Sequence, residues 1–184
     1  MSCGCGKRKG GNVTVLADHE INLADGAWGP ILWKYLHCVA EKIGMSGNAI
    51  VDTDQANYME TLLTMLPLVL PCKECQAHAA TYIGLHPVPL LRGLYNTSLR
   101  NAVREWLFAF HNAVRMSKEQ HILVSTVEEC EALYANCGVP KCEYSFFIKS
   151  IAAAVRLGWV RIDNWRKWYS NSERVRILSG NVVV

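Results

Sequence analysis

The chain has 184 residues, a hydrophobic fraction of 51% and a formal net charge of +3 at pH 7. This length suits one domain with room for an appendage, and the half-apolar composition with six Trp excludes a disordered tail. The small net charge does not point to nucleic acid as a partner, and none is expected.

Eight cysteines occur in a chain that shows no export signal. The basic run at residues 7–9 is not followed by an apolar stretch, so no signal peptide is expected. The longest apolar candidate, residues 146–160, is interrupted by Lys149 and Arg156, so no membrane span is expected either. This context favours catalytic thiols, a metal site or an enzyme that makes disulfides. The cysteines are Cys3, Cys5, Cys38, Cys72, Cys75, Cys130, Cys137 and Cys142.

The first part of the chain predicts an arm followed by two helices. Residues 1–25 are Gly-rich and basic at their start and lack apolar periodicity, so we expect a flexible arm. Apolar residues spaced by three and four then predict a helix from Trp28 to Gly44. A second helix is expected to begin at a cap formed by Asp52 or Thr53 and to end near Pro67.

Three further helical stretches follow before residue 138. The third helix is predicted from Cys72 to about Gly84, and the fourth from a Ser98 cap to about Met116. Thr126 is expected to cap a short fifth helix that stops at the Gly-Val-Pro sequence of residues 138–140.

Residues 139–184 form a predicted C-terminal extension. One more amphipathic stripe runs from Ile148 to Tyr169, with four basic residues on its opposite side, and it is expected to pack on the core or across a dimer. Residues 182–184 form either a short strand or a frayed end. The predicted class is therefore all-α: a four-helix bundle with a short fifth helix at 26–138, and a helical extension after it.

The sequence Pro71-Cys72-Lys73-Glu74-Cys75 is the strongest chemical signal. A CxxC behind a proline can open a helix with both sulfurs in the first turn, where the helix dipole favours the reactive thiolate. The alternative is half of a structural zinc site completed by His78 or by later cysteines. The spacing of those later cysteines fits a zinc knuckle poorly, which favours a redox-active dithiol.

Aromatic and imidazole side chains recur at helical spacing around this motif. Trp33 and His37 lie four residues apart on the first predicted helix, and Trp106 and His111 share the fourth. Two such faces could clamp a flat ring system beside the CxxC. Taken one at a time, each of these residues is better explained by a place in the core, and only together, around a CxxC, do they favour a site.

Three runs of residues together resemble the FAD-linked sulfhydryl oxidases of the Erv/ALR type. They are Trp28-Gly29-Pro30-x-x-Trp33-x-x-Leu36-His37, then Pro71-Cys72-x-x-Cys75-x-x-His78, then Trp106-x-x-x-Phe110-His111-Asn112-x-Val114. The resemblance covers about residues 26–136. It implies a helical bundle that holds FAD in its mouth, usually as a homodimer, and no resident metal.

The resemblance also implies roles for individual residues. Cys75 would be the flavin-proximal sulfur, and Cys72 would exchange with an incoming protein dithiol. Electrons would pass from substrate thiols to the disulfide, to FAD and to molecular oxygen, giving hydrogen peroxide. The implied FAD-binding residues are Gly29, Trp33, His37, His78, His111, Asn112, Val114 and Lys118, and Arg115 is added on the charge of its guanidinium.

Some positions depart from the family pattern. Arg115 stands where the family often carries Asn, and its guanidinium could pair with the FAD diphosphate. Leu70 stands where Tyr is frequent. The usual structural disulfide after the fourth helix has no match, and Cys130 with Cys137, or either with Cys142, is expected to replace it.

A second cysteine pair often relays electrons in such oxidases. Cys3-Gly4-Cys5 in the N-terminal arm is one candidate for this shuttle, and Cys137 with Cys142 is the other. Incidental or metal-binding cysteines are the alternative for the arm. Cys38, beside His37 in a helix, is predicted to be a buried, inert thiol.

The expected function is therefore an FAD-dependent sulfhydryl oxidase that forms disulfides in proteins. The alternative is a helical zinc-binding or scaffold module without redox activity. A cytoplasmic location is expected, which would suit a large DNA virus, with the mitochondrial intermembrane space as the alternative.

Overall fold

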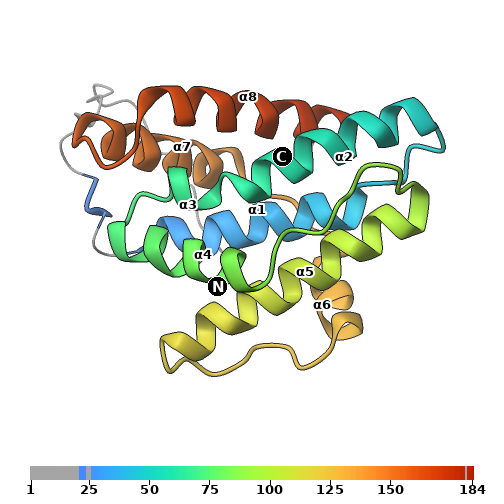
Figure 1. Cartoon of the computed structure of the whole chain (residues 1–184), viewed down its shortest axis with the longest axis horizontal. Helices are drawn as coiled ribbons and strands as arrows, with labels where there is room; N and C mark the ends of the chain where they lie inside the picture. The colour runs from blue at the N-terminus through green and yellow to red at the C-terminus, as the bar shows by residue number, and fades with distance from the viewer. Residues whose placement is uncertain (1–20, 24–25, 181) are drawn as a thin grey trace, which may run out of the picture.

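A computed structural model describes residues 21–23, 26–180 and 182–184, and the arm with Cys3 and Cys5 lies outside these residues (Figure 1). Over the described residues the chain is all-α, as predicted, and the β pairing consists of one isolated parallel bridge between Val139 and Val183. None of the described helices is both long and apolar enough to cross a membrane. The helices are α1 (Trp28–Lys42), α2 (Ala49–Thr64), α3 (Leu66–Val69), α4 (Lys73–Leu85), α5 (Asn96–Ser117), α6 (Val127–Tyr134), α7 (Lys141–Arg156) and α8 (Ile162–Leu178).

Helix α1 begins and ends where the apolar stripe predicts. The chain leaves it through Gly44, whose φ of +70° lies in the left-handed region. A Cβ at this position would collide with the carbonyl oxygen of Asn96 at the start of α5. Gly44 is therefore required both by its own conformation and by the close approach of α5.

The predicted cap of α2 is wrong. Asn48 caps this helix, because its side-chain oxygen accepts a hydrogen bond from the backbone N–H of Ile50 at 2.9 Å. Asp52, expected together with Thr53 as the alternative cap, is instead buried and accepts from the backbone N–H of Asn96 at 2.8 Å. Its carboxylate therefore fixes the start of α5, which lies two residues before the predicted Ser98 cap.

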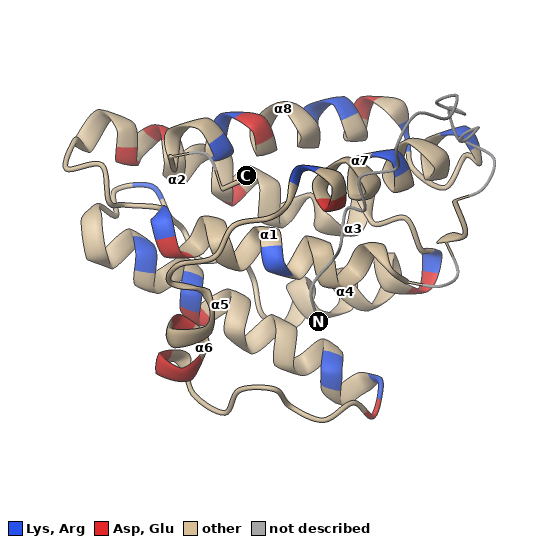
Figure 2. Ribbon diagram, turned by 180° about the vertical axis from the view of Figure 1, so that it is seen from behind, with Lys and Arg blue, Asp and Glu red and all other residues tan. Residues whose placement is uncertain are grey.

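The C-terminal stripe forms two helices rather than one. The chain turns between α7 and α8 over residues 157–161, and Gly158 has a φ of +69° there. The apolar stripe continues through this break because both helices pack on the same core. Helix α8 carries charges of both signs along its length, so it is not a purely basic helix (Figure 2).

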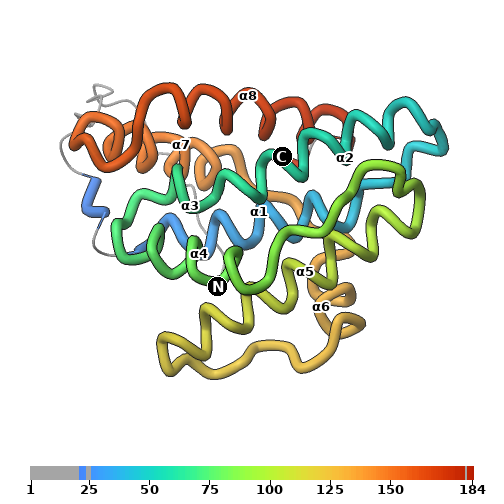
Figure 3. Tube along the Cα trace, viewed as in Figure 1, coloured from blue at the N-terminus to red at the C-terminus, as the bar shows by residue number. Residues whose placement is uncertain are grey.

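The α7–α8 hairpin packs closely on the predicted bundle. Helix α8 lies along α2, and α7 lies beside α1 (Figures 1 and 3). The buried indole of Trp168 donates to the carbonyl of Leu62 at 3.2 Å, and the buried Tyr35 hydroxyl donates to the carbonyl of Ser172 at 2.8 Å. The extension therefore shares one hydrophobic core with α1 to α5.

A disulfide joins Cys38 in α1 to Cys137 just before α7, with Cα atoms 5.6 Å apart. Cys38 is buried as predicted, but it is not a thiol. The expected pairings of Cys130, Cys137 and Cys142 with one another are also wrong, and so is the shuttle pair of Cys137 with Cys142. A cross-link that spans 99 residues typically stabilises the folded state by about 2–4 kcal/mol.

Replacing Trp168 by Ala tests whether α8 belongs to this core. We expect Trp168→Ala to lower the free energy of unfolding by about 3–5 kcal/mol, because it opens a cavity and removes a hydrogen bond. Tyr169→Ala alters the neighbouring, exposed aromatic residue and should cost less than about 1 kcal/mol. Urea unfolding of both variants measures the difference, and equal losses would contradict the packing of α8 on α2.

Candidate redox site

The CxxC motif stands at the start of α4. Cys72 is the N-cap, with an extended backbone, and its sulfur accepts a hydrogen bond from the backbone N–H of Cys75 at 3.1 Å. Cys72 therefore lies one position before the predicted first turn. Both sulfurs still stand at the positive end of the helix dipole, which stabilises negative charge on sulfur.

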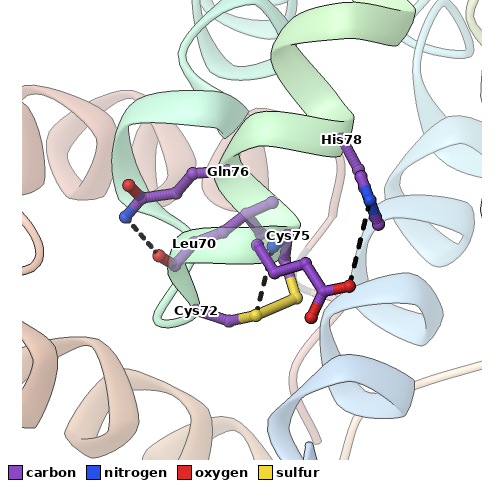
Figure 4. Close-up of a disulfide and its surroundings, with 6 residues drawn as sticks. Leu70, Cys72, Cys75, Gln76 and His78 are labelled. Atoms are coloured by element: carbon purple, nitrogen blue, oxygen red, sulfur yellow. Dashed lines mark hydrogen bonds and ion pairs between the residues drawn. A yellow bond between two sulfur atoms is a disulfide. The ribbon is translucent and has the colours of Figure 1, made fainter.

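Cys72 and Cys75 form a disulfide, with their Cα atoms 5.2 Å apart (Figure 4). Both residues are half-buried. The side-chain amide of Gln76 donates to the carbonyl of Leu70 at 2.8 Å and so braces the turn that precedes the motif. The exposed His78 lies 3.9 Å from Glu74, one helical turn earlier, and is not bonded to either sulfur.

A cavity of about 590 Å³ opens beside this disulfide. It lies between the start of α1, the α3–α4 corner, the end of α5 and the turn between α7 and α8. A cavity of this size is in the usual range for a small-molecule or cofactor site. The predicted site residues that line it are Gly29, Trp33, Cys72, Cys75, His78, Val114 and Lys118.

Three aromatic residues of the cavity wall were not predicted as site residues from the sequence. Trp28 precedes Gly29 and Phe110 precedes His111, so both lie inside runs that were recognised. Trp159 comes from the turn between α7 and α8, far from those runs, and its aromatic character alone could not place it here. The wall is therefore more aromatic than the sequence indicated.

The other predicted residues lie in a second, much smaller pocket. His37, His111, Asn112 and Arg115 line it, and α6 contributes Cys130, Leu133 and Tyr134. The structure therefore divides the predicted site residues into two neighbouring groups.

Stacked rings form the wall between the two groups. Trp33 lies in the large cavity and stacks on His111 of the small pocket, with ring centroids 4.1 Å apart. His37 stacks on Tyr134 at 4.5 Å, and its Nε2 lies 3.1 Å from Nδ1 of His111. These contacts cross between α1, α5 and α6, so spacing along the chain could not reveal them.

Polar side chains of the small pocket hold the segment that joins α5 to α6. The Asn112 amide donates to the carbonyl of Val124 at 3.3 Å, and Arg115 donates to the carbonyl of His121 at 2.7 Å. In this state both side chains donate hydrogen bonds to the protein's own backbone.

A partly buried ion-pair network holds α6 against α1 and α5. Nε of Arg104 lies 3.0 Å from Glu41, and another nitrogen of the same guanidinium lies 2.5 Å from Glu131. Arg104 and Glu41 are buried, whereas Glu131 is exposed. The network fixes the helix that carries Cys130 and thereby closes the small pocket.

Burial keeps His37, His111 and Cys130 of this pocket neutral. It lowers the pKa of His37 to about 3, with a further contribution from His111, and lowers the pKa of His111 to about 4, with a contribution from Arg115. Burial also raises the pKa of the Cys130 thiol to about 11. Cys130, 3.6 Å from Nδ1 of His37, is thus the unreactive buried thiol that the sequence assigned to Cys38.

Two features of the large cavity fit a flat polar heterocycle such as a flavin. Nε1 of Trp28 is buried and has no hydrogen-bond partner among the described residues, so a donor is available to a ligand. A Cβ added at Gly29 would meet no protein atom within 4 Å, so space is left at this wall. Aromatic walls, an unused donor and a cation at Lys118 together suit a cofactor with a ring and phosphates.

Comparisons with known proteins agree with this chemistry. The sequence model of the Erv1 / Alr family matches residues 30–131. The 096R protein of Invertebrate iridescent virus 3, by its name a proposed FAD-linked sulfhydryl oxidase, is 34% identical over 95 residues, which cover 50% of this chain and 58% of that protein. An FAD-linked sulfhydryl oxidase of African swine fever virus is 31% identical over 101 residues, covering 52% of this chain and 71% of that protein. No solved structure matches significantly.

The neutral state of His37 predicts a loss of stability in acid. In the unfolded chain His37 is protonated below about pH 6.5, whereas in the folded chain it is protonated only below about pH 3. The free energy of unfolding therefore decreases as the pH falls through this range. For His37 alone the loss between pH 7 and pH 5 is about 2 kcal/mol.

Chemical unfolding at the two pH values measures this dependence. The variant His37→Gln should show a smaller difference between pH 7 and pH 5 than the unmodified chain, whereas the exposed His121→Gln should leave the difference unchanged. An equal pH dependence in all three proteins would contradict a neutral, buried His37.

Proposed function

The chain belongs to the Erv1/Alr family, and we propose that it is an FAD-dependent sulfhydryl oxidase that forms disulfide bonds in protein substrates. The observation that carries the proposal is the Cys72–Cys75 disulfide, which caps a helix and borders an aromatic cavity of about 590 Å³. The family resemblance supports FAD as the cofactor, and the cavity beside the two sulfurs is large enough for part of such a molecule.

The proposed first reaction is an exchange of disulfides. A substrate thiolate attacks the sulfur of Cys72, the Cys72–Cys75 bond breaks, and Cys75 leaves as a thiolate at the N-terminus of α4. A second substrate thiolate then attacks the mixed disulfide and releases Cys72. The substrate gains one disulfide, and the protein gains two thiols, which corresponds to two electrons and two protons.

FAD, when bound, would accept these two electrons and two protons and deliver them to molecular oxygen, which becomes hydrogen peroxide. Trp33, Phe110 and Val114 would provide the walls for its ring, and Trp28 a hydrogen-bond donor. The ammonium group of Lys118 would suit a phosphate.

The second group of predicted residues would contact the same cofactor only after a local change. Trp33 and His111 are stacked in direct contact, which leaves no room for a third ring between them. We therefore propose that His37, His111, Asn112 and Arg115 join the cofactor site when this stack opens.

The observed state of the two cysteines favours redox chemistry over the zinc-binding alternative. Their sulfurs are bonded to each other, whereas zinc ligation requires separate thiolates. Among the described residues no group of three or more His, Cys, Asp and Glu side chains converges on a common point. A cytoplasmic location stays a proposal, which microscopy of the tagged full chain would test.

Absorption and oxygen-uptake measurements test the proposed activity. The purified protein should show a flavin spectrum that bleaches with dithiothreitol and recovers in air, with one oxygen consumed per disulfide formed. Cys72→Ser and Cys75→Ser should each lower turnover by about a hundredfold or more, since either change removes the disulfide, while the flavin remains bound.

Cys142→Ser is the matched control for these substitutions. Cys142 is exposed and does not line the cavity, so this variant should keep turnover with dithiothreitol within about twofold. A colourless protein that gains no flavin on incubation with FAD would contradict the proposal, as would full turnover by Cys75→Ser.

We also propose, from the family resemblance, that the protein is a homodimer. The sides of α1 and α2 that bear Tyr35 and Leu62 are covered by the α7–α8 hairpin, so the interface must use another surface. Light scattering after gel filtration should give twice the chain mass of 20.6 kDa. A mass of 20.6 kDa at all concentrations would show that the chain is a monomer.

A further inference from the structure

The turn between α7 and α8 reaches the helix that carries the redox cysteines. The backbone carbonyl of Trp159 accepts two hydrogen bonds from α4, one from Nζ of Lys73 and one from the side-chain amide of Gln76, each at 3.1 Å. The same amide of Gln76 also donates to Leu70, just before the CxxC. The C-terminal extension is thus bonded directly to the CxxC segment.

The backbone of this turn is held on both sides of Trp159. The N–H of Trp159 donates to the carbonyl of Ala154 at 2.9 Å, and the next residue, Val160, is buried. Gly158 provides the left-handed conformation that redirects the chain. The backbone from which the Trp159 side chain projects is therefore held in place by these contacts.

Exposure distinguishes Trp159 from the other aromatic residues of the cavity. Trp28 and Phe110 are 7% and 2% exposed, and Trp33 is half-buried. Trp159 is 37% exposed, although it lines the same cavity. Trp159 is therefore the most exposed of the indoles that line this cavity among the described residues, as is typical of a residue at a cavity rim.

A large, partly exposed indole that projects from a well-held backbone is suited to bind a polypeptide. Trp is among the residues that contribute most to protein–protein contacts, because it buries a large area at a small entropic cost. In the proposed reaction, electrons reach Cys72 from a dithiol that lies in a polypeptide, so residues next to the substrate cysteines come close to Trp159, which lines the same cavity as Cys72.

We propose that Trp159 is a specificity-determining residue that binds the polypeptide beside the substrate dithiol while a substrate thiolate reaches Cys72. This inference rests on the proposed oxidase function. Apolar side chains next to the substrate cysteines pack on the indole. A small dithiol, which has no flanking chain, does not use this contact.

Steady-state kinetics with two substrates tests the proposal. Reduced, unfolded lysozyme serves as the protein dithiol and dithiothreitol as the small one. We expect Trp159→Ala to lower kcat/KM for reduced lysozyme by about fivefold to fiftyfold, mainly through KM, and to change kcat/KM for dithiothreitol by less than about twofold. Trp159→Phe should retain most of the activity on lysozyme.

Tyr169→Ala is the matched control. Tyr169 belongs to the same hairpin and is 38% exposed, but it does not line the cavity, so its loss should alter neither substrate's kinetics. Flavin absorbance and thermal unfolding of each variant confirm that the cofactor and the fold are retained.

Three outcomes would overturn the inference while leaving the oxidase function intact. The first is unchanged kinetics of Trp159→Ala. The second is an equal loss of kcat/KM on both substrates, which would make the indole a part of the cofactor wall. The third is a loss of kcat/KM on lysozyme alone that disappears when Cys3 and Cys5 are replaced by Ser. The last result would show that Trp159 receives the protein's own arm. If the unmodified chain neither binds FAD nor oxidises dithiothreitol, the proposed function itself fails, and the inference with it.

Discussion

The redox site depends on how α4 begins. Pro71 has no backbone N–H to donate, so it cannot belong to a helix interior. The next residue, Cys72, is the N-cap of α4, and its sulfur accepts a hydrogen bond from the backbone N–H of Cys75. The Gln76 amide, one turn along, bonds to the carbonyls of both Leu70 and Trp159. One side chain therefore connects the segment before the cysteines, the helix that carries them and the C-terminal turn.

That connection gives the C-terminal hairpin a part in the site as well as in the core. Gln55 of α2 illustrates how the hairpin is held, because it accepts from the N–H of Gly44 and donates to the carbonyl of Leu178 at 3.0 Å. With α8 fixed along α2, the turn that carries Trp159 has a defined position beside the cavity. In this chain the cavity lining therefore includes Trp159, which lies C-terminal to the 30–131 family region.

The features that the sequence predicted correctly are those with local causes. The apolar stripe fixed the bounds of α1, and Thr126 caps α6 as expected, because each depends on residues within a turn or two. The cap of α2 was wrong because the partner of Asp52 lies 44 residues away in the chain. The Cys38–Cys137 pair, at a separation of 99, was beyond local reasoning for the same reason.

The division of the site into two pockets raises the question of what its opening costs. The stack of Trp33 on His111 is worth about 0.5–1.5 kcal/mol, and the hydrogen bonds from Asn112 and Arg115 to the α5–α6 segment about 1 kcal/mol each. Together these contacts cost about 2.5–3.5 kcal/mol to open, and because each 1.4 kcal/mol is tenfold in Kd, opening weakens cofactor binding by roughly a hundredfold. New contacts between the cofactor and the freed side chains must therefore offset this cost, while the Arg104 network keeps α6 in place.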